Sequence, residues 1–405
     1  MTATSHASDF VTVSNGEFML DGHPYRYAGT NFWYGPILGS PGKGGDRERL
    51  KTELDSLKAL GIDNLRILAG GEGSYSRPCQ IEPSLQTSPG VYDPDLLEGL
   101  DYLLAELERR SMRAVIYLTN SWEWSGGFGT YLEWAGHGKA PLPSIDGYKT
   151  YVGYVSEFMR DGKAKQMFAD HVRFMVGRTN SLTGRPYSES PAIMSWQICN
   201  EPRCFDKDNK ELFFEWLTST GRLIKSIDPN HLVSTGSEGT FGCEVDIDLW
   251  ARIHNDDAID YANIHIWPYN WRWVSAENLT DGLENAFEQT AEYVAAHKKL
   301  TDKPLVLEEF GYPRDSMTLA PGSPVTARDA YYRFVASLLT EGKGLNGINF
   351  WAWGGYATPK NDTWQAGDEF TGDPAQEPQG LYSVFAADST TVEIIRKTTA
   401  ALKSN

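Results

Sequence analysis

Two kinds of apolar pattern alternate along the chain. Short β-branched or aromatic runs of strand length are followed by longer segments in which apolar residues return every three or four positions, as on one face of a helix. Residues 114–118 form one short run that is entirely apolar, which is typical of a parallel strand buried on both faces. Leu96, Leu100 and Leu104 show the helical spacing, with Pro94 in the first turn. The pattern predicts strands and helices in alternation through nearly the whole sequence.

The strand-like runs fall at eight places. Strands are expected at residues 25–31, 64–68, 114–118, 193–197, 232–235, 262–265, 304–307 and 347–351. Helices are expected near residues 50–60, 96–107, 169–176, 283–294, 330–339 and 392–397, with one more that opens at a capping box formed by Asp208 and Glu211. Eight βα units predict a (β/α)8 barrel of the α/β class, a TIM barrel. A doubly wound sheet is the alternative, but no glycine-rich fingerprint follows the first strand.

The chain shows no linker, composition shift or internal repeat, so a single domain of 405 residues is expected. A short N-terminal hairpin is expected near residues 10–27, with one strand before the turn at Gly22 and the other from Tyr25 onward, closing the barrel floor. Residues 122–162 and 354–388 exceed the ~12–15 residues usual for a connection. Both follow predicted strand ends, so they are expected to be long βα loops on the catalytic face.

Composition and charge exclude several classes of protein. A hydrophobic content of 40% with 12% aromatic residues excludes a disordered chain. The net charge of −17 argues against nucleic acid or an anionic membrane surface as a partner, since phosphate binding needs a basic face. No apolar run approaches the ~20 residues of a membrane-spanning helix. A neutral sugar polymer is compatible with this charge, and a monomer is assumed.

The four cysteines, at positions 79, 199, 204 and 243, form no CxxC pair and no zinc-ligand spacing. Buried thiols or one local disulfide between Cys199 and Cys204 both fit the sequence. Residues 1–9 lack the basic and apolar regions of a signal peptide. The chain as written is therefore expected in the cytoplasm, or outside it or in the periplasm if a leader has been removed.

Two carboxylates stand at strand ends, each followed by turn chemistry. Glu201 comes after the run 193–197 and before a proline, and Glu309 comes after the run 304–307 and shortly before a glycine. Cleavage of a glycosidic bond needs such a pair, a proton donor and a nucleophile on opposite sides of one bond. An ordinary charged strand end is the alternative for either residue alone. Glu308 is a rival nucleophile, but strand alternation is expected to point it away from the side that Glu309 faces.

The Asn-Glu-Pro-Arg motif at 200–203 and the Glu-Phe-Gly motif at 309–311 together resemble glycoside hydrolase family 5, in particular its β-mannanases. The resemblance spans about residues 25–351. It implies a (β/α)8 barrel with the general acid/base after the fourth strand and the nucleophile after the seventh. Glu201 and Glu309 match these two positions. The resemblance therefore implies a retaining mechanism, with carboxyl groups about 5–5.5 Å apart.

The resemblance also implies binding roles for residues at strand ends. Arg66 matches the arginine that keeps the nucleophile ionised, and Asn200 matches the amide that bonds the sugar 2-hydroxyl. His265 matches the histidine after the sixth strand, and Trp351 matches the tryptophan under the reacting sugar. Further candidates for lining subsites are Trp33, Asn120, Trp122, Trp124 and Arg203.

One position departs from the family pattern. The family usually carries His-x-Tyr after the sixth strand, whereas this chain has Trp267 in place of the tyrosine. Trp267 is a candidate for substrate binding. The donor of a hydrogen bond to Glu309 is left open, with the nearby Tyr269 as a candidate.

The leading hypothesis is a retaining hydrolase of β-1,4-mannosidic linkages in mannan or manno-oligosaccharides. A β-1,4-glucanase is the enzymatic alternative, and a carbohydrate-binding barrel without catalysis is a second alternative that needs neither glutamate. Residues 354–388 are long enough to block one end of a cleft, which favours an exo-acting β-mannosidase over an endo-mannanase. HExxH, GxSxG and P-loop motifs are absent from the sequence, so no metal and no organic cofactor is expected.

Overall fold

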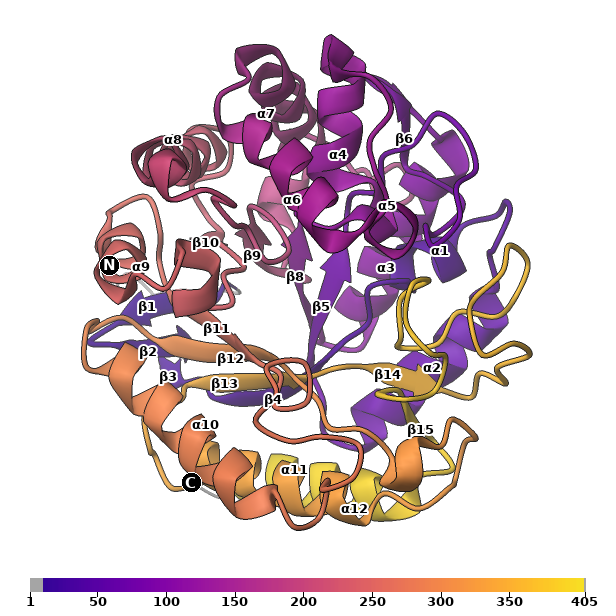
Figure 1. Ribbon diagram of the computed structural model, residues 1–405, viewed down its shortest axis with the longest axis vertical. Coiled ribbons are helices and arrows are strands. Elements are labelled where there is room, and N and C mark those ends of the chain that lie inside the picture. The colour runs from indigo at the N-terminus through magenta and orange to yellow at the C-terminus, as the bar shows by residue number, and fades with distance from the viewer. Residues whose placement is uncertain (1–9, 404–405) are drawn as a thin grey trace, which may run out of the picture.

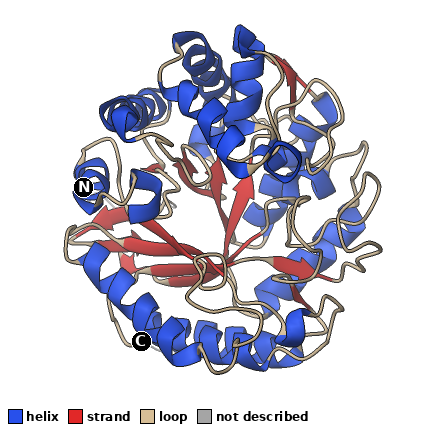
Figure 2. Ribbon diagram, in the orientation of Figure 1, coloured by secondary structure: helices blue, strands red, loops and turns tan. Residues whose placement is uncertain are grey.

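The chain folds into a ring of parallel strands with helices around its outside (Figures 1 and 2). The computed structural model describes residues 10–403, so the expectation for residues 1–9 lies outside the described residues. The strands of the ring are β4 (Tyr27–Asn31), β5 (Asn64–Leu68), β8 (Arg113–Tyr117), β9 (Ile193–Gln197), β10 (Leu232–Ser234), β11 (Ala262–Ile266), β12 (Leu305–Phe310) and β13 (Gly347–Phe350). Within the described chain they form an eight-stranded parallel sheet in the order β10-β9-β8-β5-β4-β13-β12-β11. This order confirms the predicted (β/α)8 barrel.

The two edges of the sheet, β10 and β11, are joined by hydrogen bonds. The side-chain oxygen of Asn263 accepts from the backbone N–H groups of Thr235 at 3.1 Å and Gly236 at 3.0 Å. Below them the backbone N–H of Asp260 donates to Val233 at 2.8 Å. The strands therefore surround one interior, and their carboxyl ends meet on one face.

The helices of the outer layer are α2 (Arg47–Ala59), α3 (Pro94–Arg109), α7 (Gly162–Val176), α8 (Lys210–Ile227), α9 (Ile247–Asn255), α10 (Leu283–Lys298), α11 (Thr326–Thr340) and α12 (Ser389–Lys403). The sequence pattern does not predict α9, because this helix has only nine residues and a short apolar stripe of Leu249, Trp250 and Ile253. Smaller elements in the connections are α1 (Gly35–Gly39), β6 (Gln86–Ser88), β7 (Val91–Tyr92), η4 (Tyr187–Glu189) and η7 (Asp315–Met317). No helix in the described part has the length and apolar content to cross a membrane.

The capping box predicted at the start of α8 is wrong. The helix begins at Lys210, after a 3-10 turn, η5 (Lys207–Asn209). The carboxylate of Asp206 accepts from the backbone N–H of Asp208 at 3.0 Å, so Asp206 caps this turn. Of the two alternatives left open for Cys199 and Cys204, the structure has the buried thiols, and all four cysteines are free.

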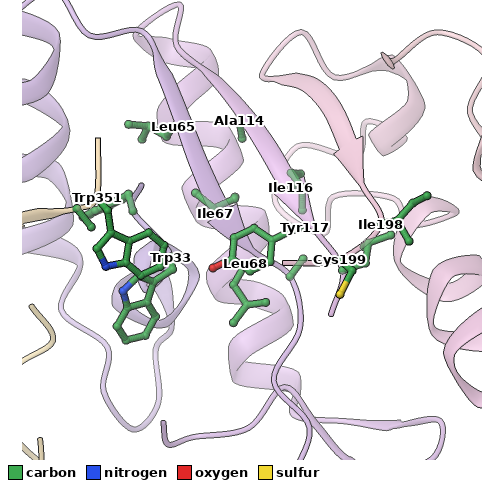
Figure 3. Packing of buried hydrophobic residues seen from close by; sticks show 14 of the residues in the cluster. Trp33, Leu65, Ile67, Leu68, Ala114, Ile116, Tyr117, Ile198, Cys199 and Trp351 are labelled. Carbon is green, nitrogen blue, oxygen red and sulfur yellow. The ribbon is translucent and has the colours of Figure 1, made fainter. Parts of the chain in front are cut away.

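Alternation along the strands separates the interior of the ring from the apolar layer under the helices. Leu65 and Ile67 of β5 pack in that layer with Ala114 and Ile116 of the neighbouring β8 (Figure 3). Arg66 lies between the two β5 residues and therefore points into the ring. A fully buried arginine in the barrel interior needs carboxylate and amide partners, and the site supplies them.

A three-stranded antiparallel sheet closes the floor of the barrel. It consists of β1 (Thr12–Ser14), β2 (Glu17–Leu20) and β3 (His23–Pro24). The hairpin partner of β2 is β3, two residues before the predicted start at Tyr25, and Tyr25 leads into β4 instead. Phe18 of β2 packs with Tyr27, Val115 and Met194 at the amino ends of the barrel strands.

The two long segments lie at the carboxyl ends of the strands. The first carries local helices, namely η1 (Glu123–Ser125), α4 (Gly127–Leu132), η2 (Glu133–His137), α5 (Pro143–Asp146), α6 (Tyr148–Val155) and η3 (Ser156–Met159). The second, residues 354–388, is held at its base by the parallel pairing of β14 (Trp353–Gly355) with β15 (Val384–Phe385). It is the yellow segment beside β14 in Figure 1. Both segments border the face on which the functional residues meet.

Candidate active site

A cavity of about 560 Å³ opens among the βα loops at the carboxyl ends of the strands. Its aromatic lining consists of Trp122, Trp124, Tyr148, Trp267, Trp271 and Trp351. Its acidic lining consists of Glu123, Glu201, Glu238, Glu309 and Glu377. Ring faces beside a few polar groups are what a site for a sugar requires.

Glu201 and Glu309 face each other in this cavity. Glu201 stands just beyond β9 in a left-handed backbone conformation with φ of 46°, and its N–H donates to Gly236 beyond β10 at 3.0 Å. One oxygen of each carboxylate lies within 4.8 Å of the other. The imidazole Nδ1 of His265 lies between them, 2.9 Å from Glu201 and 3.4 Å from Glu309. The two carboxylates therefore stand close enough to act on one bond.

The partner of Glu309 is the buried guanidinium of Arg66. One terminal nitrogen of Arg66 lies 2.5 Å from Glu309. The other terminal nitrogen donates to Asn200 at 2.8 Å, and Nε donates to Gln197 at 2.7 Å. Asn31 accepts from the first nitrogen at 3.1 Å. Four acceptors thus fix the plane of the guanidinium, which fixes Glu309 in turn.

Glu201 is held by a different group. The indole N–H of Trp122 donates to Glu201 at 2.6 Å. The guanidinium of Arg203 lies over the Trp122 ring, 5.0 Å from its centre, and Arg203 forms two bonds with the buried Glu238, at 2.5 and 2.9 Å. Arg203 therefore braces the indole that holds Glu201.

The protonation of the pair follows from these partners. Burial raises the pKa of Glu201 and of Glu309, and the charge of Glu201 raises that of Glu309 further. Two carboxyl groups this close favour a state in which they hold one proton between them, because two buried like charges repel strongly. The direct contact with Arg66 lowers the pKa of Glu309. We therefore place the charge on Glu309 and the proton on Glu201.

His265 is a neutral member of the site. Burial lowers the pKa of His265 to about 4, so the ring carries a single N–H at neutral pH. Its Nδ1 contacts the two carboxylates, and its Nε2 lies 3.9 Å from Glu308. The ring thus separates Glu201 from Glu309 without adding charge.

Glu308 does not point away from Glu309 as alternation predicts. The pairing of β11 with β12 shifts between Ile264 and His265, so Glu308 is the extra residue of a β-bulge. Its carboxylate accepts from the side-chain amide of Gln197 at 2.8 and 2.9 Å, inside the barrel. Glu308 is buried and does not line the cavity, whereas Glu309 does.

The structure brings most of the remaining sequence candidates to the cavity. Asn200, Trp122, Trp124, Trp267 and Trp351 line it, and Arg203 borders it beside Trp122. Arg66 and His265 are fully buried behind this lining and act through their contacts with the two glutamates.

Three candidates do not reach the cavity. Trp33 is buried behind it, since its N–H donates to Gly372 at 2.8 Å and its ring packs on Trp124. Asn120 is also buried and accepts from the side-chain amide of Asn200 at 3.1 Å, so it supports a lining residue. Tyr269 lines an adjacent surface hollow instead. Its expected bond to Glu309 is absent among the described contacts.

Several lining residues are not found by sequence reasoning. Glu238 follows the strand at 232–235 closely, so it carries the same strand-end signal as Glu201. Trp271, Arg272 and Glu377 lie in connections and match no motif. Their place in the cavity depends on how those connections fold.

Glu201, His265 and Glu309 also place three potential ligand atoms within 4.8 Å of one another. The arrangement does not favour a cation, because Arg66 already neutralises Glu309 by direct contact. A cation there would meet a positive charge at short range. The three groups are better suited to sharing a proton.

Two carboxyl groups within 4.8 Å, unequal in their partners and set in a cavity lined by indoles, define the site of a glycoside hydrolase. The family model described as GH family 5 beta-mannosidase-like matches residues 8–405, and the chain belongs to this family. This match confirms the predicted family and enzyme class.

Individual relatives cover nearly the whole chain. It is 30% identical to the putative mannan endo-1,4-beta-mannosidase 9 of Oryza sativa subsp. japonica, over 90% of this chain and 87% of that protein. It is 29% identical to mannan endo-1,4-beta-mannosidase 1 of Arabidopsis thaliana, over 84% of this chain and 81% of that protein. The crystal structure of a glycoside hydrolase family 5 mannosidase from Rhizomucor miehei matches with a TM-score of 0.88 and 34% identity, covering 98% of this chain and 99% of that chain.

Proposed function

We propose that the protein is a retaining β-mannosidase that releases mannose from the non-reducing ends of β-1,4-manno-oligosaccharides. The observation that carries this proposal is the pair of Glu201 and Glu309, within 4.8 Å of each other and held by unlike partners. A distance this short leaves no room for a water between carboxylate and sugar, as an inverting enzyme needs. The 34% identity to the Rhizomucor miehei mannosidase supports the substrate class.

In the first step the ionised Glu309 attacks the anomeric carbon of the terminal mannose. Glu201 gives its proton to the glycosidic oxygen, so the leaving sugar departs as an alcohol. The bond from the anomeric carbon to that oxygen breaks as the bond to Glu309 forms. Arg66 stays beside the carboxylate and orients it.

In the second step Glu201, now ionised, takes a proton from a water. The water attacks the anomeric carbon and the ester to Glu309 breaks, which releases mannose with its original configuration. Asn200 lines the cavity beside both carboxylates, and we assign its free amide N–H to the sugar 2-hydroxyl. Trp351 provides an indole face under the same sugar.

Exo action is supported by an end wall formed by Pro374, Gln376 and Glu377, which line the cavity. One side-chain oxygen of Gln376 and one of Glu377 are buried without a hydrogen-bond partner in the described chain. Buried polar atoms without partners are unfavourable, so hydroxyl groups of a bound sugar, which both donate and accept, are suitable partners for them. A terminal mannose presents a free 4-hydroxyl to such a wall, whereas in an internal mannose this oxygen is bonded to the next sugar.

Buried charges hold the segment that carries the end wall. Arg314 forms two bonds with Asp388, at 2.8 and 2.5 Å. Arg314 and Arg328 both donate to the backbone of Ser383, at 3.0 and 3.1 Å. Asp373, just before the wall, accepts from the backbone of Gly380 at 2.7 Å. The segment that carries the wall is therefore tied to the barrel by buried contacts, which supports a wall that stays in place at one end of the cavity.

The test of exo action is a product time course with mannohexaose, run beside cellohexaose. Early mannose with mannopentaose is expected. A spread of di-, tri- and tetrasaccharides would instead identify an endo-1,4-β-mannanase, the activity for which the rice and Arabidopsis relatives are named. Cleavage of cellohexaose alone would remove the mannoside assignment and identify a β-1,4-glucanase.

The roles of the two glutamates are tested with Glu309→Ala and Glu201→Ala in the presence of azide. Azide in the space left by Glu309 should give the α-mannosyl azide, because it attacks once and inverts. Azide with the Glu201 variant and an activated substrate should give the β-mannosyl azide, because it attacks the ester on Glu309. The exposed Glu369→Ala is the matched control and should hydrolyse normally. If Glu309→Ala gave the β-mannosyl azide and Glu201→Ala gave the α-mannosyl azide, the roles of the two glutamates would be exchanged.

A further inference from the structure

A cluster of aromatic side chains stands at the rim of the cavity, outside the machinery described above. Trp271 lines the cavity and packs on Phe241, with ring centres 4.4 Å apart. Trp273 and Tyr293 back it at 5.1 and 5.3 Å. Trp271 and Phe241 are half-buried, so part of each ring remains exposed. We refer to Trp271 and Phe241 as the rim platform.

The rim platform is fixed by the backbone beneath it. The N–H of Trp271 donates to Trp267 at 2.9 Å, which ties the platform to the cavity lining. The hydroxyl of Tyr293 donates to the backbone of Glu238 at 2.9 Å. Glu238 is the residue that pairs with Arg203. The platform is thus connected to the group that braces Glu201.

The position of the platform in the barrel decides which sugar it meets. Phe241 lies in η6 (Thr240–Cys243), which follows β10, and Trp271 follows β11. The end wall follows β13, and β13 lies opposite β9 in the ring. In Figure 1 the segment of the end wall lies near β14, across the barrel mouth from β10. With the terminal mannose placed between Glu309 and the end wall, the next sugar would extend toward the loops after β10 and β11, where the platform stands.

Arg272 adds a polar group to this rim. Its backbone is left-handed, with φ of 60°, and it lines the same cavity as Trp271. Within the described chain its guanidinium has neither a carboxylate partner nor a hydrogen-bonded acceptor. An exposed fork of donors beside an indole face is suited to hydroxyl groups of a sugar stacked on the ring.

We propose that Trp271, backed by Phe241, stacks the sugar that leaves when the bond is cut, with Arg272 donating to its hydroxyl groups. This inference rests on the proposed function, because it requires the terminal mannose to lie between Glu309 and the end wall. The face of the Trp271 ring stabilises a leaving group that is itself a sugar. It does not stabilise a leaving group that has no sugar ring.

The experiment compares two substrates that share the mannosyl group. Cleavage of mannobiose has a second mannose as its leaving group, which would stack on the platform. Cleavage of β-mannosyl fluoride has a fluoride ion as its leaving group, which has no ring to stack. In Trp271→Ala the kcat/KM for mannobiose should fall roughly tenfold, the size expected for one lost ring contact. The kcat/KM for the fluoride should stay within about twofold of the unchanged enzyme. Trp271→Phe, which keeps a ring, should recover most of the loss on mannobiose.

Trp134→Ala is the matched control, since Trp134 is a half-buried tryptophan that bonds Ser74 at 2.9 Å and does not line the cavity. It should change neither substrate. Equal losses on both substrates in Trp271→Ala, or no loss on mannobiose, would overturn the platform and leave the mannosidase assignment standing. Failure of the unchanged enzyme to hydrolyse either mannoside would overturn the proposed function, and the platform with it.

Discussion

Arg66 and Glu309 form an ion pair at 2.5 Å, with the guanidinium fully buried inside the barrel. The same guanidinium bonds Asn200, so one side chain from β5 positions both a carboxylate from β12 and an amide that follows β9. Interactions between charges are strong where water is excluded. The pair therefore does more than fill the barrel, because it makes Glu309 the ionised member of the two glutamates.

Arg66→Lys should reduce kcat/KM on the order of a hundredfold, the size typical for loss of one preorganised electrostatic contact. Lysine keeps the charge but cannot reach Glu309, Asn200 and Gln197 together. Arg66 lowers the pKa of Glu309. A weaker contact therefore raises that pKa, and the acidic limb of the pH profile of kcat/KM should move to higher pH.

Arg178→Lys is the matched control, because Arg178 pairs with the buried Asp101 at 2.8 Å away from the cavity. It should lower the melting temperature without moving the acidic limb. An unmoved limb in Arg66→Lys would show that Glu309 is not kept ionised by this contact.

Trp122→Phe should move the opposite limb of the profile. The indole N–H at 2.6 Å stabilises the ionised form of Glu201, so its removal raises the pKa of Glu201. Glu201 must be protonated to act as an acid, hence the alkaline limb of kcat/KM should shift to higher pH. The ring of phenylalanine keeps the contact with Arg203 in part.

Trp124→Phe provides the comparison, since Trp124 lines the same cavity but makes no described hydrogen bond to Glu201. Its alkaline limb should match that of the unchanged enzyme. If the alkaline limb of kcat/KM were the same in Trp122→Phe and Trp124→Phe, the indole of Trp122 would not control the pKa of Glu201.

Glu377→Ala should raise the KM for mannobiose by roughly tenfold, because the sugar loses a hydrogen-bond partner at the end wall. Burial raises the pKa of Glu377 to about 8, so the group is a neutral acid at neutral pH. Glu377→Gln is close to this form in shape and charge and should keep most of the affinity. Unchanged KM in Glu377→Ala, measured beside the exposed Glu369→Ala, would remove Glu377 from substrate recognition.

The order of the strands and the meeting of the two glutamates can both be predicted from the sequence, because the barrel topology determines where each strand ends. Parallel strands of a barrel end on the same face, so Glu201 after the fourth strand and Glu309 on the seventh must meet. Arg66 is predictable for the same reason, since alternation along β5 turns it inward between Leu65 and Ile67.

The orientation of Glu308 could not be predicted in this way, and the length of residues 354–388 predicts a blocking segment but not which of its residues face the cavity. Glu308 lies inside the barrel because of a bulge that exists only once β11 and β12 are paired. The end wall takes its place from contacts distant in sequence, such as Arg314 with Asp388. Neither the bulge nor the residues that form the wall can be read from a local sequence pattern.

The stability of the protein should fall with acid partly through His171. Burial lowers the pKa of His171 from 6.5 to about 4. The hydroxyl of Tyr92 donates to one ring nitrogen at 3.0 Å, and the other ring nitrogen donates to Ala69 at 3.1 Å, so the neutral ring is fully bonded. Below the unfolded pKa the unfolded chain binds a proton that the folded protein does not bind, and the free energy of unfolding decreases as pH falls.

For His171 alone this loss amounts to about 2 kcal/mol between about pH 8 and about pH 5. The variant His171→Gln does not show this loss of unfolding free energy. The other buried histidines contribute equally to the pH dependence of both proteins. The variant should be less stable than the unchanged protein near neutral pH, and the difference should narrow by about this amount on acidification. Urea unfolding at the two pH values measures it. If the difference in unfolding free energy between the two proteins stayed constant with pH, His171 would bind a proton as readily in the folded protein as in the unfolded chain.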